Sequence, residues 1–336
     1  MKTNILNILF ILLFSLPSFS KSIQDHSEDY IALESGIELY VKHWSATNDQ
    51  PTIVLINGLT YSTHEWDAFI QSLHKINPDI GILTFDMRGM GKTLSRNLLK
   101  DFLTPDISSP FHQADDLYML LEKMNIQTPL HLMGLSYGGG VAQAYMSKYG
   151  RSQGVQSSFL VAPLITPVPA QMEWVSKRIK ITRALFPFLK ISEQDLFAFY
   201  FRQLVYSTFP MAEPIVLEHP FKLEGVYRLA LAARHFNGHD LVELHPDHSI
   251  HFIAPTHDEY ITQEEFRAYW EGLPKKKRGS LIYLENVRHK APEEAPALLA
   301  NVIFQMITSK DKKYFKGQTF SSRDFEKGLC LQSFIF

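Results

Sequence analysis

Cysteine is nearly absent from this sequence of 336 residues. The single one, Cys330, cannot form a disulfide within the chain, nor supply a zinc site that needs two or more thiolates. Neither sign of charge dominates, because the formal net charge is −2, so the sequence predicts no overall field that gathers nucleic acid or anionic lipid. We expect no cofactor, no metal and no nucleic-acid partner, and a large apolar core in a chain that is 45% hydrophobic.

Long apolar runs are also missing, with one exception near the start of the chain. Residues 5–16 are almost all apolar, follow Lys2, and precede a proline and small residues at 18 and 20. This order is typical of a secretory signal peptide over residues 1–20, so we expect cleavage before Lys21 and an exported protein, periplasmic or extracellular. An uncleaved N-terminal anchor is the alternative. No later segment is long and apolar enough to span a bilayer, so we expect no integral membrane span in the mature chain.

Short strand patterns alternate with helical patterns along much of the remaining chain. The strand patterns lie at 52–56, 80–85, 130–133, 157–161, 250–254 and 281–284, and a β-hairpin is predicted over 31–44. The helical patterns lie at 66–76, 111–124, 138–148 and 295–307. In the second of these helices we expect Asp115, Asp116 and Glu122 on the solvent side. The alternation predicts an α/β fold with a mainly parallel central sheet and flanking helices.

This alternation stops between residues 166 and 248. Helical patterns separated by prolines fill the stretch, at 172–186, 193–205 and 222–234, with Ser192 and Asp195 as a helix start. A helical block inserted in an α/β domain lies over the carboxyl ends of the strands, so we predict a helical cap over 166–248. The core then comprises 21–165 and 249–308. The tail at 309–336 is first basic and then rich in phenylalanine, and the sequence assigns no role to it.

The segment Gly134-Leu135-Ser136-Tyr137-Gly138 carries the clearest chemical pattern. It follows a predicted strand and opens a predicted helix, which is the context of a G-x-S-x-G turn that presents a nucleophilic serine. Side chains at Gly134 and Gly138 would collide with neighbouring backbone in such a turn. We therefore predict that Ser136 is a nucleophile, with N–H groups of the helix N-terminus beside it.

A serine hydroxyl needs a base, and in this architecture an acid and then the base follow the serine in chain order. His289 stands in the loop after the predicted strand 281–284, and this position singles it out among 14 histidines. Asp258 stands in the loop after the preceding strand, where it would hold the His289 tautomer and stabilise the imidazolium. Glu259 and Asp247 are the alternative acids.

The chain resembles the α/β-hydrolase superfamily, and within it the monoacylglycerol lipase and lysophospholipase-like esterases. Five stretches carry the resemblance in order: Leu55-Ile56-Asn57-Gly58-Leu59, Phe85-Asp86-Met87-Arg88-Gly89-Met90-Gly91, the Ser136 turn, the Asp258 loop and the His289 loop. The resemblance implies an oxyanion hole made by the N–H groups of Leu59 and Tyr137. Where the family usually has His-Gly, this chain has Asn57-Gly58. Asparagine can still hydrogen-bond neighbouring backbone, so we expect this change to affect loop detail and substrate preference more than the chemistry.

Residues 89–93, Gly-Met-Gly-Lys-Thr, end like a phosphate-binding P-loop with the pattern G-x-x-x-x-G-K-[ST]. The first glycine of that pattern would fall at position 86, which is Asp86. An acidic residue there argues against nucleotide binding. We expect Asp86 and Arg88 to fix the turn by local hydrogen bonds instead.

A serine with a base and an oxyanion hole favours acyl transfer to water. We expect a serine hydrolase that cleaves carboxylic esters through an acyl-enzyme intermediate, with acyl glycerols and lysophospholipids as candidate substrates. An amidase, peptidase or lactonase using the same three residues is the alternative, and a non-catalytic binding protein on this scaffold is the third reading. In the cap, Phe197, Phe201 and Leu204 have helical spacing and either line an acyl-chain pocket or pack the cap onto the sheet. The sequence does not predict the oligomeric state.

Overall fold

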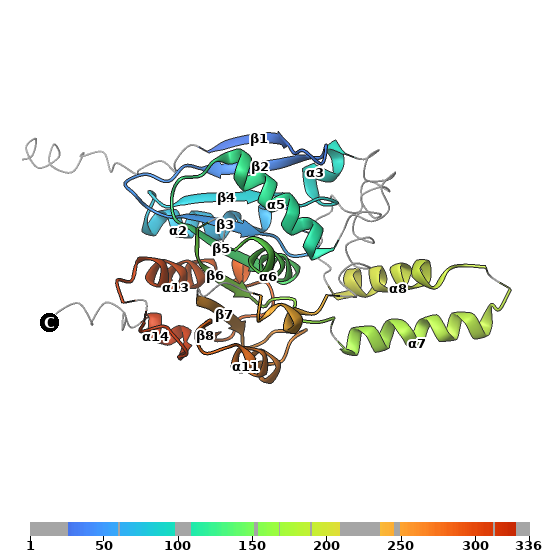
Figure 1. Cartoon of the computed structure of the whole chain (residues 1–336). Coiled ribbons are helices and arrows are strands. Elements are labelled where there is room, and N and C mark those ends of the chain that lie inside the picture. Colours follow the sequence, from blue (N-terminus) through green and yellow to red (C-terminus); the bar gives the residue numbers. More distant parts are fainter. Residues whose placement is uncertain are drawn as a thin grey trace, which may run out of the picture.

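A computed structural model gives the arrangement of the chain (Figure 1). It describes residues 26–59, 61–97, 109–150, 154–167, 169–188, 190–208, 236–244, 249–311 and 313–326. Three of the predictions from sequence lie outside the described residues. They concern the signal peptide at 1–20, the cap helix at 222–234 and the alternative acid Asp247. The side chain of Phe201 also lies outside the description.

A nine-stranded sheet forms the centre of the described part, in the order β1-β2-β4-β3-β5-β6-β7-β8-β9. The strands are β1 Ser27–Ala32, β2 Glu38–Trp44, β3 Thr52–Ile56, β4 Gly81–Phe85, β5 Leu130–Leu135, β6 Val155–Val161, β7 Ser249–Pro255, β8 Arg278–Leu284 and β9 Thr319–Ser321. β1 pairs antiparallel with β2 as the predicted hairpin, β2 pairs antiparallel with β4, and every later pairing is parallel. The predicted α/β class with a mainly parallel sheet is confirmed.

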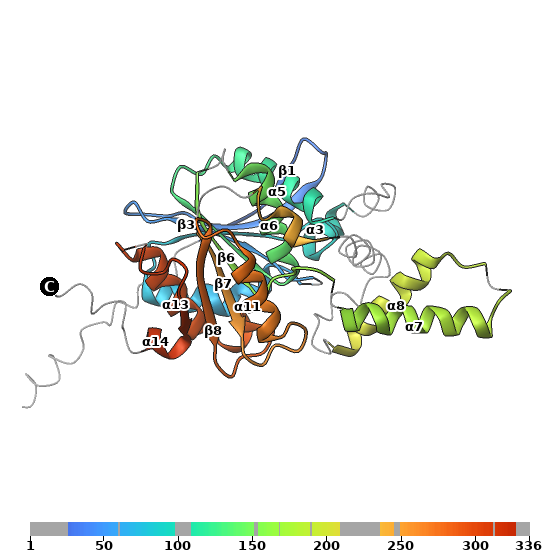
Figure 2. The same cartoon turned by 60° about the horizontal axis from the view of Figure 1, so that its bottom comes forward.

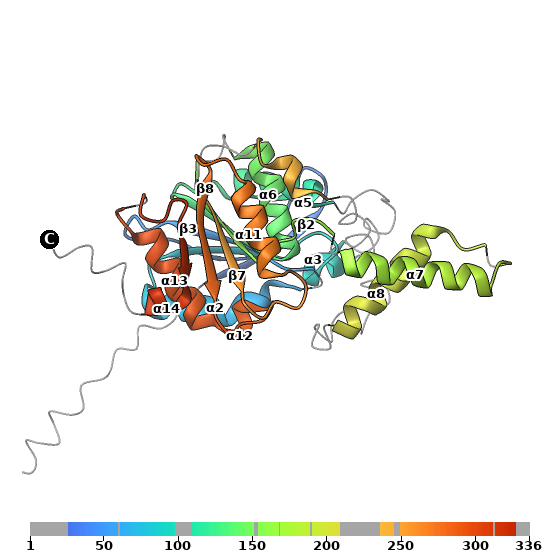
Figure 3. The ribbon, with the colours of Figure 1, turned by 90° about the horizontal axis from the view of Figure 1, so that it is seen from below.

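Helices cover both faces of this sheet. Figure 3 shows α2, α12 and α13 on one side and α5, α6 and α11 on the other. The helices are α2 Asp67–Ile76, α3 Gly91–Arg96, α5 Pro110–Met124, α6 Tyr137–Tyr149, α7 Pro169–Leu185, α8 Glu193–Thr208, α11 Gln263–Gly272, α12 Ala291–Glu294, α13 Pro296–Thr308 and α14 Ser322–Glu326, with 3-10 turns η1 Thr63–Trp66 and η2 Gly238–Leu241. Within the described ranges, no helix combines the length and apolar character needed to cross a membrane.

The middle strands are buried because their apolar sequences are covered on both faces. Every residue of β3, β4 and β5 is buried, as expected for parallel strands between two helical layers. The edge strand β1 instead exposes five of its six residues. The buried middle strands form a rigid platform, and the loops at their carboxyl ends carry the residues singled out by the sequence.

α7 and α8 form a helical hairpin that projects away from the sheet and its covering helices (Figures 1 and 2). α8 begins at the predicted start, where the Ser192 Oγ accepts the N–H of Asp195 at 3.0 Å. The hairpin has a small core of its own, in which Val175 and Phe197 are buried and Leu204 packs against them. Phe197 and Leu204 therefore pack within the hairpin, and the boundaries predicted for the whole cap stay a prediction.

Part of the C-terminal tail extends the fold. β9 pairs with β8, and α14 packs against α13. The side chains of Phe315 and Phe325 are each 1% exposed, and the ring of Phe320 lies 5.7 Å and 5.8 Å from theirs. The phenylalanine-rich stretch thus packs the tail onto the edge of the sheet, a role that the sequence did not predict.

Asp116 does not lie on the solvent side of α5, so that part of the prediction is wrong. Its side chain is 2% exposed and receives two hydrogen bonds from the guanidinium of Arg88, at 2.8 Å and 2.6 Å. Arg88 was expected to bond within its own turn, but it instead joins the loop after β4 to α5. Glu122 is exposed as predicted, and the partly exposed Asp115 pairs with Lys148 at 2.6 Å.

Candidate active site

Ser136 lies between β5 and α6 in a strained backbone conformation. Its φ is 52° and its ψ is −115°, a region that residues other than glycine rarely adopt. Main-chain hydrogen bonds hold the turn, because the Ser136 N–H donates to the Val161 carbonyl at 2.9 Å and the Ser136 carbonyl accepts the Leu164 N–H at 2.7 Å. The residue is only half-buried, so the tight turn does not enclose it.

Gly134 and Gly138 occupy places where a side chain would collide with backbone. A Cβ added to Gly134 would lie 2.3 Å from the carbonyl oxygen of Gly138, and one added to Gly138 would lie 2.2 Å from that of Ile56. Backbone cannot give way as the end of a flexible side chain can. The steric reason for the two glycines, predicted from the sequence, is therefore present in the structure.

Asp258 and His289 meet at the carboxyl edge of the sheet. β7 and β8 are parallel neighbours, and the loops that follow them carry these two residues. The His289 Nδ1 lies 2.8 Å from the Asp258 Oδ2, and the two side chains are 7% and 1% exposed respectively. A carboxylate at Nδ1 favours the tautomer with the proton on that nitrogen and leaves the Nε2 lone pair for an incoming proton.

The Asp258 carboxylate is held from its other side as well. Its Oδ1 accepts the main-chain N–H groups of Tyr260 at 2.8 Å and Ile261 at 3.0 Å. The ring of Tyr260 stands edge-on to the imidazole of His289, with 4.7 Å between centroids. The orientation of the imidazole is thus fixed by a buried carboxylate and by an aromatic neighbour.

Glu259, the alternative acid, contacts His289 in a different way. Its Oε2 accepts the main-chain N–H of His289 at 3.2 Å, and its side chain is 43% exposed. The adjacent His257 is exposed, and its Nδ1 lies 3.2 Å from the hydroxyl of Thr256. Of the described carboxylates near this loop, Asp258 is the one whose oxygen meets the imidazole.

Main-chain hydrogen bonds join the two loops that carry this pair. The Thr256 N–H donates to the Leu284 carbonyl at 3.0 Å, and the His257 N–H donates to the Val287 carbonyl at 2.9 Å. The hydroxyl of Thr256 also accepts the N–H of Asn286 at 2.9 Å. The two loops therefore form one connected unit, which keeps the Asp258–His289 distance from depending on the side chains alone.

The loop after β3 is held by hydrogen bonds of two buried side chains, Asn57 and Glu65. The Asn57 side chain is fully buried, donates to the Phe85 carbonyl at 3.0 Å and accepts the Trp66 indole N–H at 3.0 Å. This asparagine does bond to backbone, as expected, but the carbonyl belongs to the adjacent strand β4 and not to its own loop. Glu65, 2% exposed, accepts the Gly58 N–H at 2.7 Å, so that N–H is already engaged within the loop.

Leu59 and Tyr137 lie on two sides of the same region. Leu59 packs against the main core and also against the core of the α7–α8 hairpin. Tyr137 is the first residue of α6. Burial raises the pKa of the Tyr137 phenol well above its ordinary value, so its side chain brings no charge to the site.

The residue after His289 connects its loop to the loop after β3. The ammonium of Lys290 lies 4.1 Å above the ring of Tyr61, and the Tyr61 N–H donates to the Gly58 carbonyl at 3.3 Å. The loops after β3, β7 and β8 therefore meet at one edge of the sheet. The Ser136 turn adjoins the end of β3, because a Cβ added to Gly138 would lie 2.2 Å from the Ile56 carbonyl oxygen.

Asp86 fixes its turn by a local hydrogen bond to Lys92, as predicted, and also bonds Thr63, 23 positions earlier. Its carboxylate accepts the main-chain N–H groups of Thr63 and Lys92, each at 2.7 Å. A Cβ added to Gly91 would lie 2.2 Å from the same carboxylate. The place that a P-loop would keep for phosphate is thus taken by an acidic side chain, which argues against an anion site there.

A pocket of about 210 Å³ lies beside Tyr260. Its lining combines apolar residues with polar ones from three segments of the chain: Ile165, Thr166, His239, Tyr260, Ile261, Glu265, Ala268 and Tyr269. The sequence did not single out Tyr260 or α11, although Thr262 and Glu265 form a capping box that could have marked the helix start. The described ranges contain no group of three or more histidine, cysteine or acidic side chains placed to hold a metal ion.

Comparisons with known proteins bear first on the fold. A family model described as alpha/beta hydrolase fold matches residues 51–192. An esterase from Exiguobacterium antarcticum superposes with a TM-score of 0.60 at 16% sequence identity, over 84% of this chain and 100% of that one. The chain has the α/β-hydrolase fold. The resemblance to the α/β-hydrolase superfamily is therefore confirmed.

Two curated proteins match shorter stretches of this chain. A protein of Schizosaccharomyces pombe named "Putative monoglyceride lipase" is 33% identical over 110 residues, which is 32% of this chain and 28% of that protein. A bifunctional esterase/perhydrolase of Acinetobacter calcoaceticus is 24% identical over 152 residues, which is 45% of this chain and 51% of that protein. The matched regions thus span between about a quarter and a half of these relatives.

Proposed function

We propose that this α/β-hydrolase is a serine hydrolase that cleaves carboxylic esters. The observation that carries the proposal is the strained Ser136 turn, at the same sheet edge as a buried Asp258–His289 pair with 2.8 Å between its nitrogen and oxygen. Strain at a single residue needs compensation from the surrounding structure and is concentrated at functional sites. The names of the curated relatives, one a lipase and one an esterase, support the same class of reaction.

The proposed reaction divides hydrolysis into two acyl transfers. The Ser136 Oγ attacks the ester carbonyl carbon while His289 Nε2 takes the hydroxyl proton, and Asp258 stabilises the imidazolium. His289 then gives that proton to the departing alcohol, which leaves an acyl group on Ser136. Water, deprotonated by His289, attacks the acyl-enzyme, and the acid product leaves as the proton returns to Ser136.

The developing oxyanion needs N–H donors that are already in place. We assign this role to the main-chain N–H groups of Leu59 and Tyr137. The bond from the Gly58 N–H to Glu65 supports this choice, because it engages the N–H just before Leu59. The position of Tyr137 in the first turn of α6 supports the second donor.

The ester class is tested by a substrate panel. Purified protein is given p-nitrophenyl esters of rising acyl length beside aminoacyl anilides, with Ser136→Ala protein as the background. Hydrolysis of esters well above that background, with anilides near it, supports the proposal, and a maximum at long chains favours acyl glycerols or lysophospholipids. Preferential anilide hydrolysis would instead establish an amidase or peptidase, and no turnover of either set would favour a binding protein.

We also propose export, on the pattern of Lys2, the apolar run 5–16 and the small residues at 18 and 20. N-terminal sequencing of protein recovered from the periplasm or medium should begin at Lys21. Protein that keeps Met1 and stays with the membrane would establish the N-terminal anchor instead.

A further inference from the structure

Exposed apolar side chains are concentrated on the α7–α8 hairpin. Eleven large hydrophobic side chains are exposed among the described residues. Six of them fall between residues 181 and 199, namely Ile181, Leu185, Phe186, Phe188, Ile191 and Phe199. Leu185 and Phe188, at the turn between the helices, are the most exposed of all eleven, at 65% and 74%. Clustering of this kind marks an interaction surface, whereas scattered single residues need no explanation.

Contacts between described residues join the two sides of this tip. The Arg183 guanidinium donates to the Ile191 carbonyl at 2.9 Å and so joins the end of α7 to the segment before α8. The rings of Phe186 and Phe188 stand edge to face, 6.2 Å apart. The helix on the far side of the turn is capped by Ser192. The turn therefore holds its apolar side chains outward in a defined arrangement.

The hairpin also differs in charge from the rest of the chain. Residues 169–208 contain six Lys and Arg against three Asp and Glu, a net charge of +3 in a chain whose total is −2. The remainder therefore carries −5. Lys177, Lys180 and Lys190 are exposed. The net charge of the whole chain does not reveal this local excess of positive charge. Lys177 and Lys180 lie within roughly 12 Å of Leu185 along the axis of α7.

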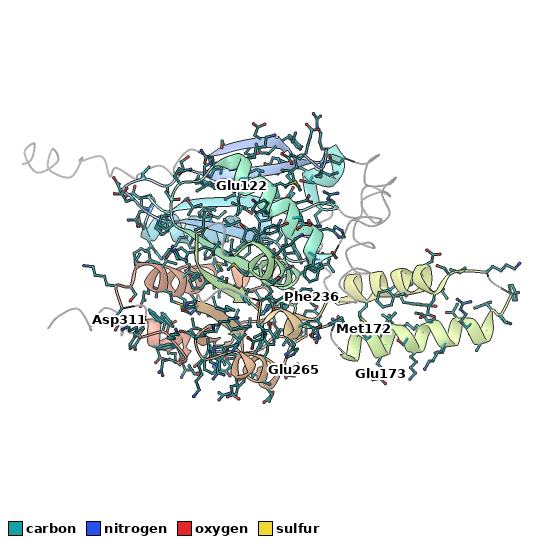
Figure 4. All side chains as sticks on the ribbon, viewed as in Figure 1. Glu122, Met172, Glu173, Phe236, Glu265 and Asp311 are labelled. Atoms are coloured by element: carbon teal, nitrogen blue, oxygen red, sulfur yellow. The ribbon has the colours of Figure 1, made fainter. Side chains whose placement is uncertain are left out.

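The hairpin is long enough to reach a surface while the sheet stays clear of it. α7 has 17 residues, a length of about 25 Å. Met172 and Glu173 mark its root beside the sheet and its covering helices (Figure 4), and the tip points away from them (Figures 1 and 2). At the root, Leu59 of the loop after β3 packs against the hairpin core. The hairpin thus links the candidate site to an exposed, basic and apolar tip.

We propose that the tip of the α7–α8 hairpin binds an anionic lipid surface. Aromatic and aliphatic side chains flanked by lysines suit the boundary between acyl chains and negatively charged headgroups, where apolar burial and electrostatic attraction act together. Contact between the tips of two copies is disfavoured because it would bring +3 against +3. The proposal does not depend on hydrolysis, since it concerns where the protein docks.

Binding is tested on the full chain carrying Ser136→Ala, so that no lipid is consumed. Sedimentation with vesicles of phosphatidylcholine, or of phosphatidylcholine with one-third phosphatidylglycerol, should show binding at least tenfold stronger to the second, weakening as salt is added. A Phe186→Ser/Phe188→Ser variant should lose at least tenfold in binding to the anionic vesicles. A Lys177→Gln/Lys180→Gln/Lys190→Gln variant should lose the preference for them. Leu244→Ser, at another exposed leucine (56%), should behave as the parent.

A tip-specific readout separates this contact from any made by the apolar run 5–16. Tryptophan fluorescence of a Phe188→Trp variant, corrected for the four native tryptophans, should be quenched by brominated lipid, whereas that of a matched Leu244→Trp variant should not. Unquenched Phe188→Trp, or full binding by the Phe186→Ser/Phe188→Ser variant, would overturn the proposal. Self-association of the parent without vesicle binding, abolished in the same double variant, would also overturn it and establish a second copy as the occupant. Unchanged circular dichroism confirms that each variant is folded.

Discussion

The sheet edge and the α7–α8 hairpin differ in which side chains they bury and which they expose. At the sheet edge, Asp258 and His289 are almost fully buried, and their polar atoms meet partners at hydrogen-bonding distance. The hairpin buries two apolar residues in its own core, Val175 and Phe197, and exposes six large ones. The first arrangement suits a fixed geometry for chemistry, since orientation must be set before substrate arrives. The hairpin leaves apolar side chains exposed, and only contact with a second molecule or a membrane would bury them.

The comparison also separates two sources of stability. The main core has dozens of buried hydrophobic residues from every layer of the fold, so the sheet and its loops should unfold together. The hairpin core is small and touches the main core through Leu59. Local opening of the hairpin should therefore cost much less free energy than global unfolding. The following changes test that division, beginning with the largest expected effect.

Removing the nucleophile tests whether the sheet edge is the chemical centre. Ser136→Ala deletes one oxygen and should lower ester turnover on the order of a millionfold, as loss of a catalytic serine does in other hydrolases. The rate is measured with the best ester of the panel, and the melting temperature should stay close to that of the parent. A folded Ser136→Ala protein with parental activity would remove the basis of the proposed function.

Replacing the acid tests whether the buried Asp258 carboxylate orients the His289 imidazole and stabilises its charged form. Asp258→Asn keeps the shape but loses the charge that fixes the His289 tautomer, so turnover should fall by about ten-thousandfold with little change in KM. Glu259→Gln is the matched control. Its amide oxygen can still accept the His289 N–H, and we expect a rate within a few-fold of the parent. A crippled Glu259→Gln beside an active Asp258→Asn would mean that the acid is misassigned.

Much of this edge could be predicted from sequence because its signals are local. The glycines at 134 and 138, the strand before Ser136 and the order of acid and base along the chain all lie within short segments. Neighbouring strands then bring their loops together by the geometry of a parallel sheet. Asn57 was recognised as a departure, but its two partners were not, because Phe85 and Trp66 reach it only through the fold.

Features that depend on distant contacts were missed or mispredicted. Asp116 reads as a solvent-side residue of an amphipathic helix, and only the approach of Arg88, 28 positions earlier, explains its burial. The tail phenylalanines gave no periodic signal, although Phe315 and Phe325 are buried. Periodicity could not say whether apolar residues of the hairpin face inward or outward, since a helix with apolar residues on several sides satisfies both readings.

Truncating one aromatic residue in each region tests whether the hairpin opens independently of the sheet. Phe252→Ala in β7, where the side chain is fully buried, should lower the free energy of global unfolding by about 3–5 kcal/mol. Phe197→Ala should instead increase hydrogen exchange of the α7 and α8 amides while β5 amides keep their protection. Chemical denaturation and residue-resolved exchange measure the two effects. Equal loss of protection in β5 and α7 after Phe197→Ala would show that hairpin and sheet form one cooperative unit.

Two neighbouring acids on α5 allow the stability contributions of a buried and a partly exposed ion pair to be compared. Asp116→Ala leaves the Arg88 guanidinium, 12% exposed, without its bidentate partner and should cost about 3 kcal/mol of unfolding free energy. Asp115→Ala removes a partly exposed ion pair with Lys148 and should cost about 1 kcal/mol or less. Denaturant titrations of the two variants give the difference. Equal losses of unfolding free energy in the two variants would mean that burial does not make the Arg88–Asp116 pair more important for stability than the exposed pair.

The last prediction concerns a buried imidazole of the main core that has a hydrogen-bond partner within the described ranges on only one of its two nitrogens. His74 is 5% exposed, and its Nε2 donates to the Ile80 carbonyl at 3.1 Å, while its Nδ1 finds no partner among the described residues. Protonation would place a charge and an unsatisfied proton in the core, and burial accordingly lowers the pKa of His74 below its ordinary value.

Below a pH of about 6.5 the unfolded chain therefore binds a proton at this histidine that the folded protein does not, so stability is lost as the pH falls through that value. The wild-type slope from this one group can reach about 1.4 kcal/mol per pH unit.

His74→Gln keeps a donor for the Ile80 carbonyl but cannot titrate. Unfolding free energies of both proteins between pH 7.5 and 5 should diverge, with the wild type losing more on acidification. His43, whose pKa burial also lowers, contributes to both curves and cancels in their difference. Parallel curves would show that the folded protein accommodates the charged imidazole without cost.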